Sequence, residues 1–147
     1  IISNGLMDQT YIYSLGIGNT TGISRLHLQD LTPGAALHSE HKEDLEYSFE
    51  GKKPIIWTEG IYVVTLDYVC SELNIIPNVI KIDTDGNEGK ILQGASKTLK
   101  SSSLNAIILE MPLEQEEYCV SLLSKSGFKR KIHSNKASRN QIWLKSI

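Results

Sequence analysis

Apolar and polar positions alternate along the first half of the chain in the way that β-strands require. Residues 11–17 carry apolar side chains at every second position, which is typical of a strand with one buried face, and residues 23–28 look like a second strand. The turn-forming residues 18–22 separate them, so we expect a β-hairpin. Residues 55–64 are rich in β-branched and aromatic side chains around a Glu-Gly break, and we expect strand structure there as well.

The second half of the chain contains apolar residues that recur every three or four positions. This spacing predicts helices at residues 66–73, 87–99 and 114–125. Thr65 is a suitable N-cap for the first helix, because its hydroxyl can accept a hydrogen bond from a backbone N–H of the first turn. Gly127 is a suitable stop for the third helix, since glycine tolerates the left-handed conformation that ends many helices.

Short, almost wholly apolar segments alternate with these helices. Residues 79–83 and 106–109 have the composition of strands that are covered on both faces of a sheet. Residues 128–133 and 141–147 are predicted to form a closing antiparallel pair. The alternation of strands and helices therefore predicts an α/β domain with a mostly parallel sheet and helices on both of its faces.

Two further stretches carry weaker patterns. Residues 1–8 are expected to form the end of a helix that stops at Asn4 and Gly5. Residues 29–53 are polar, and we expect a long loop or a short surface helix that shapes the substrate site.

Composition limits the classes of partner. The chain has 147 residues, of which 40% are hydrophobic and 22% charged, as in an ordinary globular domain. The formal net charge of -2 provides no field that would attract a polyanion, so nucleic acid is not an expected partner. No segment has the roughly 18 consecutive apolar residues of a membrane span, so no membrane partner is expected. Cys70 and Cys119 lie in helical patterns, which suits reduced thiols and a cytoplasmic protein.

The best candidates for chemistry lie where two predicted strands end. In open α/β sheets, ligands bind beyond the carboxyl ends of the strands, because loops and helix N-termini converge there. Asp83 and Glu110 stand at the ends of two such strands, so we expect both carboxylates on one rim of the sheet. A carboxylate that ends a buried strand is costly unless something pairs with it, which favours a functional role for Asp83.

The residues around Asp83 leave several roles open. Asp83, Asp85 and Glu88 could hold a cofactor amine, take a proton from a substrate hydroxyl or coordinate a cation. Alternatively, Asp85 and Glu88 stabilise the next helix through its dipole. Lys81 is expected either to meet Glu110 or a substrate oxygen, or to keep its ammonium group in solvent. No metal site is expected, because an EF-hand loop would need glycine at the position of Glu88 and the histidines show no ligand spacing.

Four segments together resemble the signature of FkbM-family methyltransferases. Residues 79–88 read VIKIDTDGNE and residues 91–95 read ILQGA, which is similar to the family pattern around its acidic turn and the helix after it. Residues 107–110, IILE, resemble the next family strand, and residues 65–67, TLD, resemble the start of an upstream helix. The likeness keeps its order and spacing over most of the chain from Tyr11 onward.

The resemblance implies a Rossmann-like class I methyltransferase sheet and S-adenosylmethionine as the cofactor. Family members usually methylate an oxygen of a sugar, a polyketide or another small metabolite. For this chain, the resemblance implies that Asp83 contacts the cofactor near the transferred methyl group. It implies that Glu88, Glu110 and Lys81 orient the methyl acceptor.

The resemblance also sets residues 11–17 as the third strand of the family sheet. The end of that strand, at Gly16 and Ile17, would then border the adenine of the cofactor. The chain departs from the family where Thr84 and Asp85 replace a Val-Glu pair. It departs further because the glycine-rich loop after the first family strand, and the acidic residue that ends the second, have no counterpart.

These departures predict that residues 1–147 form a single partial methyltransferase domain that lacks the first two strands of the sheet. An apolar central strand would then be bare, so we expect the chain to be unstable, to aggregate or to pair with a partner that covers this edge, such as an oligomer or a missing N-terminal segment. The alternative is a noncatalytic α/β binding or assembly module that keeps the scaffold without the cofactor half.

Overall fold

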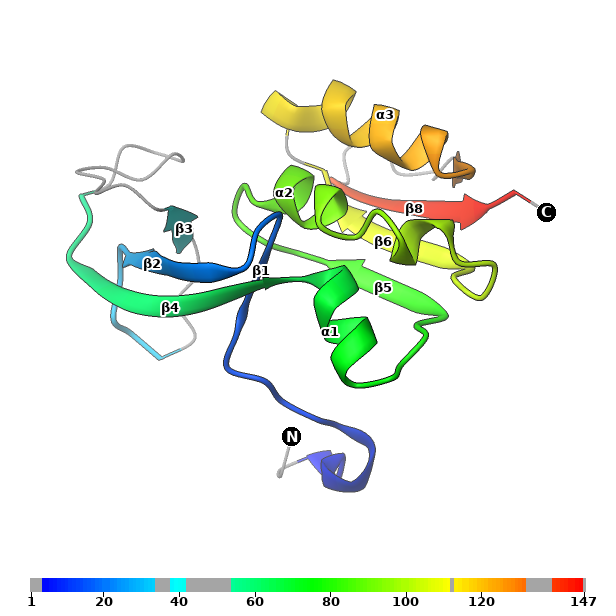
Figure 1. Ribbon diagram of the computed structural model, residues 1–147. Helices are drawn as coiled ribbons and strands as arrows, with labels where there is room; N and C mark the ends of the chain where they lie inside the picture. Colours follow the sequence, from blue (N-terminus) through cyan, green and yellow to red (C-terminus); the bar gives the residue numbers. More distant parts are fainter. Residues whose placement is uncertain (1–3, 34–37, 42–53, 112, 132–138, 147) are drawn as a thin grey trace.

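The strands form two four-stranded sheets rather than one. The computed structural model describes residues 4–33, 38–41, 54–111, 113–131 and 139–146 (Figure 1). The strands of the first sheet are β1 (Gly16–Gly18), β2 (Gly22–Leu28), β3 (Ser39–His41) and β4 (Trp57–Thr65). The strands of the second sheet are β5 (Val79–Ile82), β6 (Ala106–Glu110), β7 (Phe128–Lys131) and β8 (Asn140–Lys145). The α/β class is confirmed, but the single mostly parallel sheet is wrong.

The first sheet has the order β1-β4-β2-β3, with β4 parallel to β1 and antiparallel to β2. The predicted hairpin of β1 and β2 is therefore wrong, since β4 lies between them. The physical reason is the length of β4. It is an unbroken strand that pairs with every residue of β2, from Gly22 opposite Val63 to Leu28 opposite Trp57. Gly60 continues this strand instead of breaking it.

The second sheet has the order β5-β6-β8-β7. β5 runs parallel to β6, whereas β8 runs antiparallel to both β6 and β7. The closing antiparallel pair is thus confirmed within the described residues, while residues 132–133 and 147 of the prediction lie outside them. Within the described part, β5 has one neighbour, so it is an edge strand rather than an interior one.

In the part of the chain that the structure describes, three helices connect the strands: α1 (Leu66–Glu72), α2 (Glu88–Gln93) and α3 (Glu116–Lys125). The Thr65 hydroxyl accepts a hydrogen bond from the backbone N–H of Tyr68 at 3.1 Å, so the predicted cap is confirmed. α2 is shorter than predicted: the chain turns at Gly94 and forms a 3₁₀ segment only at Thr98–Lys100. A second 3₁₀ segment, Leu113–Gln115, precedes α3.

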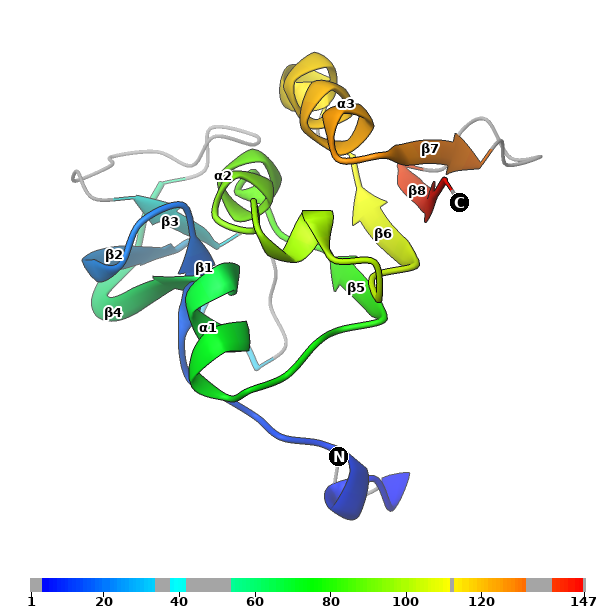
Figure 2. The ribbon, with the colours of Figure 1, turned by 45° about the vertical axis from the view of Figure 1, so that its right-hand side comes forward.

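The hydrophobic core lies between the second sheet and the helices α2 and α3 (Figures 1 and 2). Its fully buried side chains include Leu92, Leu99, Leu104, Ile107, Leu109, Leu123 and Phe128. On the other face of the sheet, Val79 is 57% exposed and Leu144 is 42% exposed. Helices on both faces were therefore wrongly predicted for this sheet within the described residues.

The two sheets meet where the chain leaves α2. The carbonyl oxygen of Gly94 accepts a hydrogen bond from the backbone N–H of Asp67 at 3.1 Å. A Cβ at position 94 would lie 2.0 Å from the carbonyl oxygen of Gly18, so only glycine allows this approach. Asp67 in turn accepts backbone hydrogen bonds from Lys97 at 2.9 Å and Thr98 at 2.8 Å. The contact between α2 and the end of β1 therefore joins the halves of the molecule without strand pairing.

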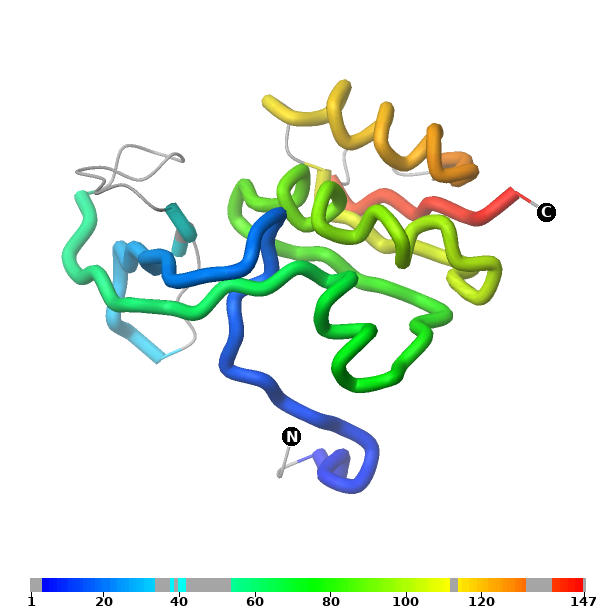
Figure 3. Tube along the Cα trace, in the orientation of Figure 1, coloured from blue at the N-terminus to red at the C-terminus, as the bar shows by residue number. Residues whose placement is uncertain are grey.

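The segment before β1 runs away from the body of the molecule (Figure 3). A short 3₁₀ turn at Met7–Gln9 replaces the predicted helix end, of which residues 1–3 lie outside the described part. The predicted strand 11–17 is reduced to Gly16–Gly18, and Tyr11 is 85% exposed. Of the predicted loop 29–53, residues 39–41 form β3, whereas residues 34–37 and 42–53 lie outside the described part.

Candidate functional site

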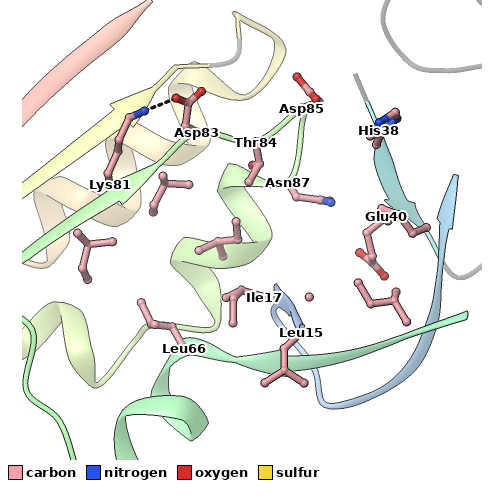
Figure 4. A pocket seen from close by; sticks show the side chains of 16 residues that line it. Leu15, Ile17, His38, Glu40, Leu66, Lys81, Asp83, Thr84, Asp85 and Asn87 are labelled. Carbon is pink, nitrogen blue, oxygen red and sulfur yellow. Dashed lines mark hydrogen bonds and ion pairs between the residues drawn. The ribbon is translucent and has the colours of Figure 1, made fainter. Parts of the chain in front are cut away.

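A cavity of about 540 Å³ lies between β1 and β5 (Figure 4). Consecutive residues of both strands line it, together with Leu26 of β2, Glu40 of β3 and Ile61 of β4, so the free edges of β1 and β5 and one face of the first sheet form its walls. Its apolar residues are Leu15, Ile17, Leu26, Ile61, Leu66, Ile80, Ile82 and Ile91. Its polar residues are His38, Glu40, Lys81, Asp83, Thr84, Asp85 and Asn87. The cavity thus has an apolar interior and a polar rim at the carboxyl end of β5.

Asp83 follows directly after β5 and lines this cavity, as predicted for a strand end. Its carboxylate forms an ion pair with Lys81 on the same edge (Figure 4). The Lys81 hydrogen bond is the main reason that the pKa of Asp83 is lowered, so Asp83 is held as a carboxylate. Its side chain is 42% exposed, so this carboxylate is open to a ligand rather than sealed inside the fold.

Glu110 stands beside Asp83, as predicted. The register pairs Ile82 with Leu109, so the next residue of each strand projects from the same rim. A hydrogen bond between the two side chains raises the pKa of Glu110, and its burial and the negative charge of Asp83 act in the same direction. Two neighbouring carboxyl groups resist simultaneous ionisation, so the pair shares the first proton that it takes up as the pH falls, and the raised pKa assigns that proton to Glu110.

Glu88 occupies a different position from the other predicted catalytic residues. It is 1% exposed and does not line the cavity. Its Oε1 accepts a hydrogen bond from the Thr84 hydroxyl at 2.8 Å, while its Oε2 is buried and has no hydrogen-bond partner in the described part of the chain. Burial raises the pKa of the nearby Cys119 thiol to about 11, and the charge of Glu88 adds to this. Glu88 therefore stabilises the acidic turn from the protein interior, through its hydrogen bond with Thr84.

Gln115 is a residue of the site that sequence reasoning missed. Its Nε2 donates to the carbonyl oxygen of Gly86 at 2.7 Å, and its Oε1 accepts from the backbone N–H of Gly89 at 3.2 Å. Gly86 lies in the left-handed region with φ 100°, where glycine is favoured, so this amide clamps a turn that the sequence makes tight. The position of Gln115 shortly after the rim residue Glu110 is the one signal that could have indicated it.

Glu40 was missed as well, because it falls in the polar stretch for which a loop or a surface helix was expected. It lies on β3 and faces Asp83 from the other side of the cavity (Figure 4). Its Oε1 accepts a hydrogen bond from the Ser24 hydroxyl, and its Oε2 pairs with Lys90 Nζ at 3.4 Å. Its side chain is only 14% exposed.

The two predicted adenine neighbours, Gly16 and Ile17, line the same cavity as Asp83 and Lys81. The structure therefore brings together four of the six predicted site residues at one cavity and places Glu110 directly beside it. Their roles toward a cofactor or an acceptor remain predictions.

A sequence model of the methyltransferase FkbM domain matches residues 3–129. The chain belongs to this family. The predicted family resemblance is confirmed, and the acidic turn at Asp83 is the family segment that borders the cavity.

The fold agrees with this assignment. A crystal structure of the methyltransferase FkbM from Methylobacillus flagellatus KT superimposes with a TM-score of 0.53 and 13% sequence identity. The match covers 97% of this chain and 32% of that chain, so this FkbM domain spans about a third of the matched structure. The search of curated proteins found no match.

Two residues of the FkbM signature have structural rather than chemical roles in this chain. Gly94 is required by the close approach of Gly18, and Asp67 anchors α1 to the segment after α2. Asp83 differs from both, because its side chain is open to the cavity.

Among the described residues, no group of three or more histidine, cysteine, aspartate or glutamate side chains is placed to hold a metal ion. No helix of the described part is long and apolar enough to cross a bilayer.

Proposed function

We propose that this FkbM domain takes part in S-adenosylmethionine-dependent methylation of a hydroxyl group on a small metabolite such as a sugar or a polyketide. The observation that carries the proposal is the position of Asp83. It lies at the carboxyl end of a parallel strand and in one cavity with Gly16 and Ile17. In α/β folds this is the place where ligands meet catalytic side chains.

The residues present fit part of the cofactor. The apolar edge formed by Ile17, Leu66 and Ile80 suits a flat adenine ring, and the carboxylate of Asp83 suits an ammonium group. S-adenosylmethionine would supply the methyl group as an electrophilic sulfonium substituent. The described residues provide no glycine-rich loop for its methionine end.

The chain's own residues supply charge and proton handling. The lowered pKa of Asp83 keeps its Oδ atoms ready to accept a hydrogen bond from an acceptor hydroxyl. Lys81 holds this carboxylate through the ion pair, and Glu110, whose pKa is raised, is the carboxyl group of the pair that takes up a proton first as the pH falls. This arrangement orients a hydroxyl group and can receive its proton at Asp83 as the oxygen becomes alkylated.

Isothermal titration of the full-length protein that carries this domain with S-adenosylmethionine tests the proposal. We expect saturable binding that Asp83→Asn weakens about tenfold, the effect of one charge-assisted hydrogen bond. Glu117→Gln changes an exposed carboxylate on α3, outside the cavity, and should leave the affinity unchanged. Equal affinity of wild type and Asp83→Asn would remove Asp83 from the cofactor site.

A noncatalytic binding or assembly module is the second candidate, and the two strand edges favour it. β1 and β5 each have one neighbour in the described part, and both edges line the cavity. An extended segment of another polypeptide could pair with such an edge through backbone hydrogen bonds. Absence of cofactor binding, combined with protection of the β5 amides from hydrogen exchange only when a partner is added, would favour this candidate.

We also propose a cytoplasmic location. Cys70 and Cys119 are both free thiols, and Cys119 is fully buried, as in proteins of a reducing compartment.

A further inference from the structure

The wall of the cavity opposite Asp83 carries a carboxylate that is fixed in place. Glu40 lies on β3, which pairs with β2 through the register Leu26 to Glu40. Its two oxygens are held by different elements, Oε1 by Ser24 of β2 and Oε2 by Lys90 of α2. Because only 14% of the side chain is exposed and both oxygens are held, its orientation is set before any ligand binds.

Among the described residues, the partners of the fixed carboxylate leave part of its hydrogen-bonding capacity unused. A carboxylate can accept about four hydrogen bonds, and two of the sites on Glu40 are taken by Ser24 and Lys90. Glu40 borders both the 540 Å³ cavity and a second, polar cavity of about 320 Å³ that Asn19 and Lys90 also line. A ligand in the larger cavity can therefore reach this side chain.

A second group beside Glu40 also has bonding capacity to spare. His38 lines the same cavity, and its Nδ1 is buried without a hydrogen-bond partner in the described part of the chain. A buried ring nitrogen without a partner is costly, so rotation of the ring toward the cavity to meet a ligand hydroxyl would be favoured. Figure 4 shows His38 and Glu40 on the same wall, facing the turn that carries Asp85.

The charges that line the cavity are unbalanced. Three carboxylates, on Glu40, Asp83 and Asp85, stand against two ammonium groups, since Lys81 pairs with Asp83 and Lys90 pairs with Glu40. Carboxylates accept hydrogen bonds and repel anions, so this lining favours ligands that present donors and opposes phosphate or carboxylate groups.

We propose that Glu40 is a specificity-determining residue of this cavity, which selects methyl acceptors that present hydroxyl or ammonium groups over acceptors that carry an anionic group. The inference rests on the proposed function, since it names the class of acceptor that the methyltransferase would take. Ser24 and Lys90 act through Glu40 as positioning residues, because they fix its oxygens.

Three probes on one sugar ring test the proposal: methyl glucoside, glucosamine and glucose 6-phosphate. Each is titrated into the ¹⁵N-labelled chain while the amide signals of Glu40, Thr84 and Asn87 are followed. We expect the first two probes to shift these signals and glucose 6-phosphate to bind at least about tenfold more weakly. Equal binding of the phosphate, or no shift of these amides with any probe, overturns the proposal.

The variant Glu40→Gln tests the residue itself. It keeps an oxygen that can accept from Ser24 but removes the charge, so we expect discrimination against glucose 6-phosphate to fall about tenfold. Glu117→Gln is the matched control and should keep the wild-type preference. If the amide spectrum of Glu40→Gln loses its dispersion, the variant is not folded. The comparison of the three probes on the wild-type chain then decides whether the cavity discriminates against the phosphate.

Titration with S-adenosylmethionine distinguishes a failure of the proposed methyl transfer from a failure of the proposed role of Glu40. Amide shifts with S-adenosylmethionine but equal binding of all three sugars would keep the proposed function and overturn the role of Glu40. Selective sugar binding by a full-length protein that shows no response to S-adenosylmethionine would support the selectivity of Glu40 and overturn methyl transfer.

Discussion

Gln115 binds the acidic turn at two points, with Nε2 on the carbonyl oxygen of Gly86 at 2.7 Å and Oε1 on the backbone N–H of Gly89 at 3.2 Å. The side chain comes from the segment just before α3, so it ties the loop after β6 to the loop after β5. The geometry of the turn therefore depends on an amide that is remote in sequence.

Gln115→Ala should loosen this turn. It removes two hydrogen bonds, each worth about 1 kcal/mol, so we expect a lower free energy of unfolding and several-fold weaker binding of S-adenosylmethionine. Urea unfolding and calorimetric titration measure the two effects. Gln9→Ala, in the exposed N-terminal 3₁₀ turn, should change neither. Unaltered binding by Gln115→Ala would show that the turn keeps its shape without the clamp.

The paired carboxyl groups of Asp83 and Glu110 should give the site a bounded pH range. The pKa of Asp83 is lowered, so its contribution to stability is present above its unfolded pKa and lost as the pH falls through its folded pKa. The pKa of Glu110 is raised, so its contribution is present below its unfolded pKa and lost as the pH rises through its folded pKa. The pair therefore contributes most to stability at pH values above the unfolded pKa of Asp83 and below the unfolded pKa of Glu110.

Carboxyl ¹³C NMR of the labelled chain checks this prediction. We expect Glu110 to titrate above its ordinary range and Asp83 below it. Glu110→Gln keeps a hydrogen-bond donor at every pH, so the high-pH loss should disappear in this variant. A Glu110 signal that titrates normally would contradict the shared proton.

Gly94→Ala should be among the most destabilising single changes in the chain. The added Cβ would lie 2.0 Å from the backbone oxygen of Gly18, and neither backbone can move without disturbing the junction of the sheets. We expect a loss of about 3 kcal/mol in the free energy of unfolding. Gly60→Ala is the matched control, because a Cβ there meets nothing within 4 Å. Similar stability of the two variants would refute the role of this contact.

Asp67 should give the fold an acid-sensitive anchor. Burial alone would raise its pKa, but the hydrogen bonds from Lys97 and Thr98 outweigh this effect and lower it. Its contribution is therefore present above its unfolded pKa and is lost as the pH falls through its folded pKa. Because the side chain is partly exposed, we expect Asp67→Asn to cost only about 1 kcal/mol at neutral pH.

Chemical unfolding at several pH values measures this difference. The gap in stability between wild type and Asp67→Asn should narrow toward low pH, while Asp8→Asn, in the exposed N-terminal turn, should match the wild type throughout. A gap that stays constant down to strongly acidic pH would argue against an ionised anchor.

The free edge of β5 should make the isolated chain self-associate. β5 has a single neighbour in the described part, and Val79 on it is 57% exposed, so its unpaired backbone groups are open to another chain. Sedimentation velocity should show concentration-dependent association that Val79→Lys reduces, because a charge on an edge strand opposes pairing. A wild-type chain that sediments as a monomer at all concentrations would contradict the prediction.

Local patterns predicted those parts of the fold that local physics decides. The apolar runs of β5 and β6 and the Thr65 cap are set by residues close in sequence, and all three are confirmed. The hairpin prediction failed because β2 pairs with β4, whose residues lie 29 to 41 positions away from their partners, rather than with its sequence neighbour β1. Such a choice depends on the length and fit of strands that a local window does not contain.

The candidate site divides in the same way. Asp83 and Glu110 were found because both end strands, and strand ends have a known relation to ligands. Glu88 was placed at the cavity because its sequence position is close to Asp83, but the side chain at the start of α2 turns into the protein. Glu40 and Gln115 act through contacts with residues far away in the chain, so no sequence motif predicts their roles.

The meeting of Gly18 with Gly94 has a consequence for the size of the ligand. Since no described strand pairs across the two sheets, the spacing between Ile17 and Asp83 is set by this crossing and by a few other contacts, such as Asp67 with Thr98 and Glu40 with Lys90, rather than by a ladder of backbone hydrogen bonds. A small rotation about the crossing would widen or narrow the gap as a hinge does. Relatives could thus accommodate bulkier or slimmer molecules by exchanging side chains around the hinge, with every residue that touches the ligand left as it is.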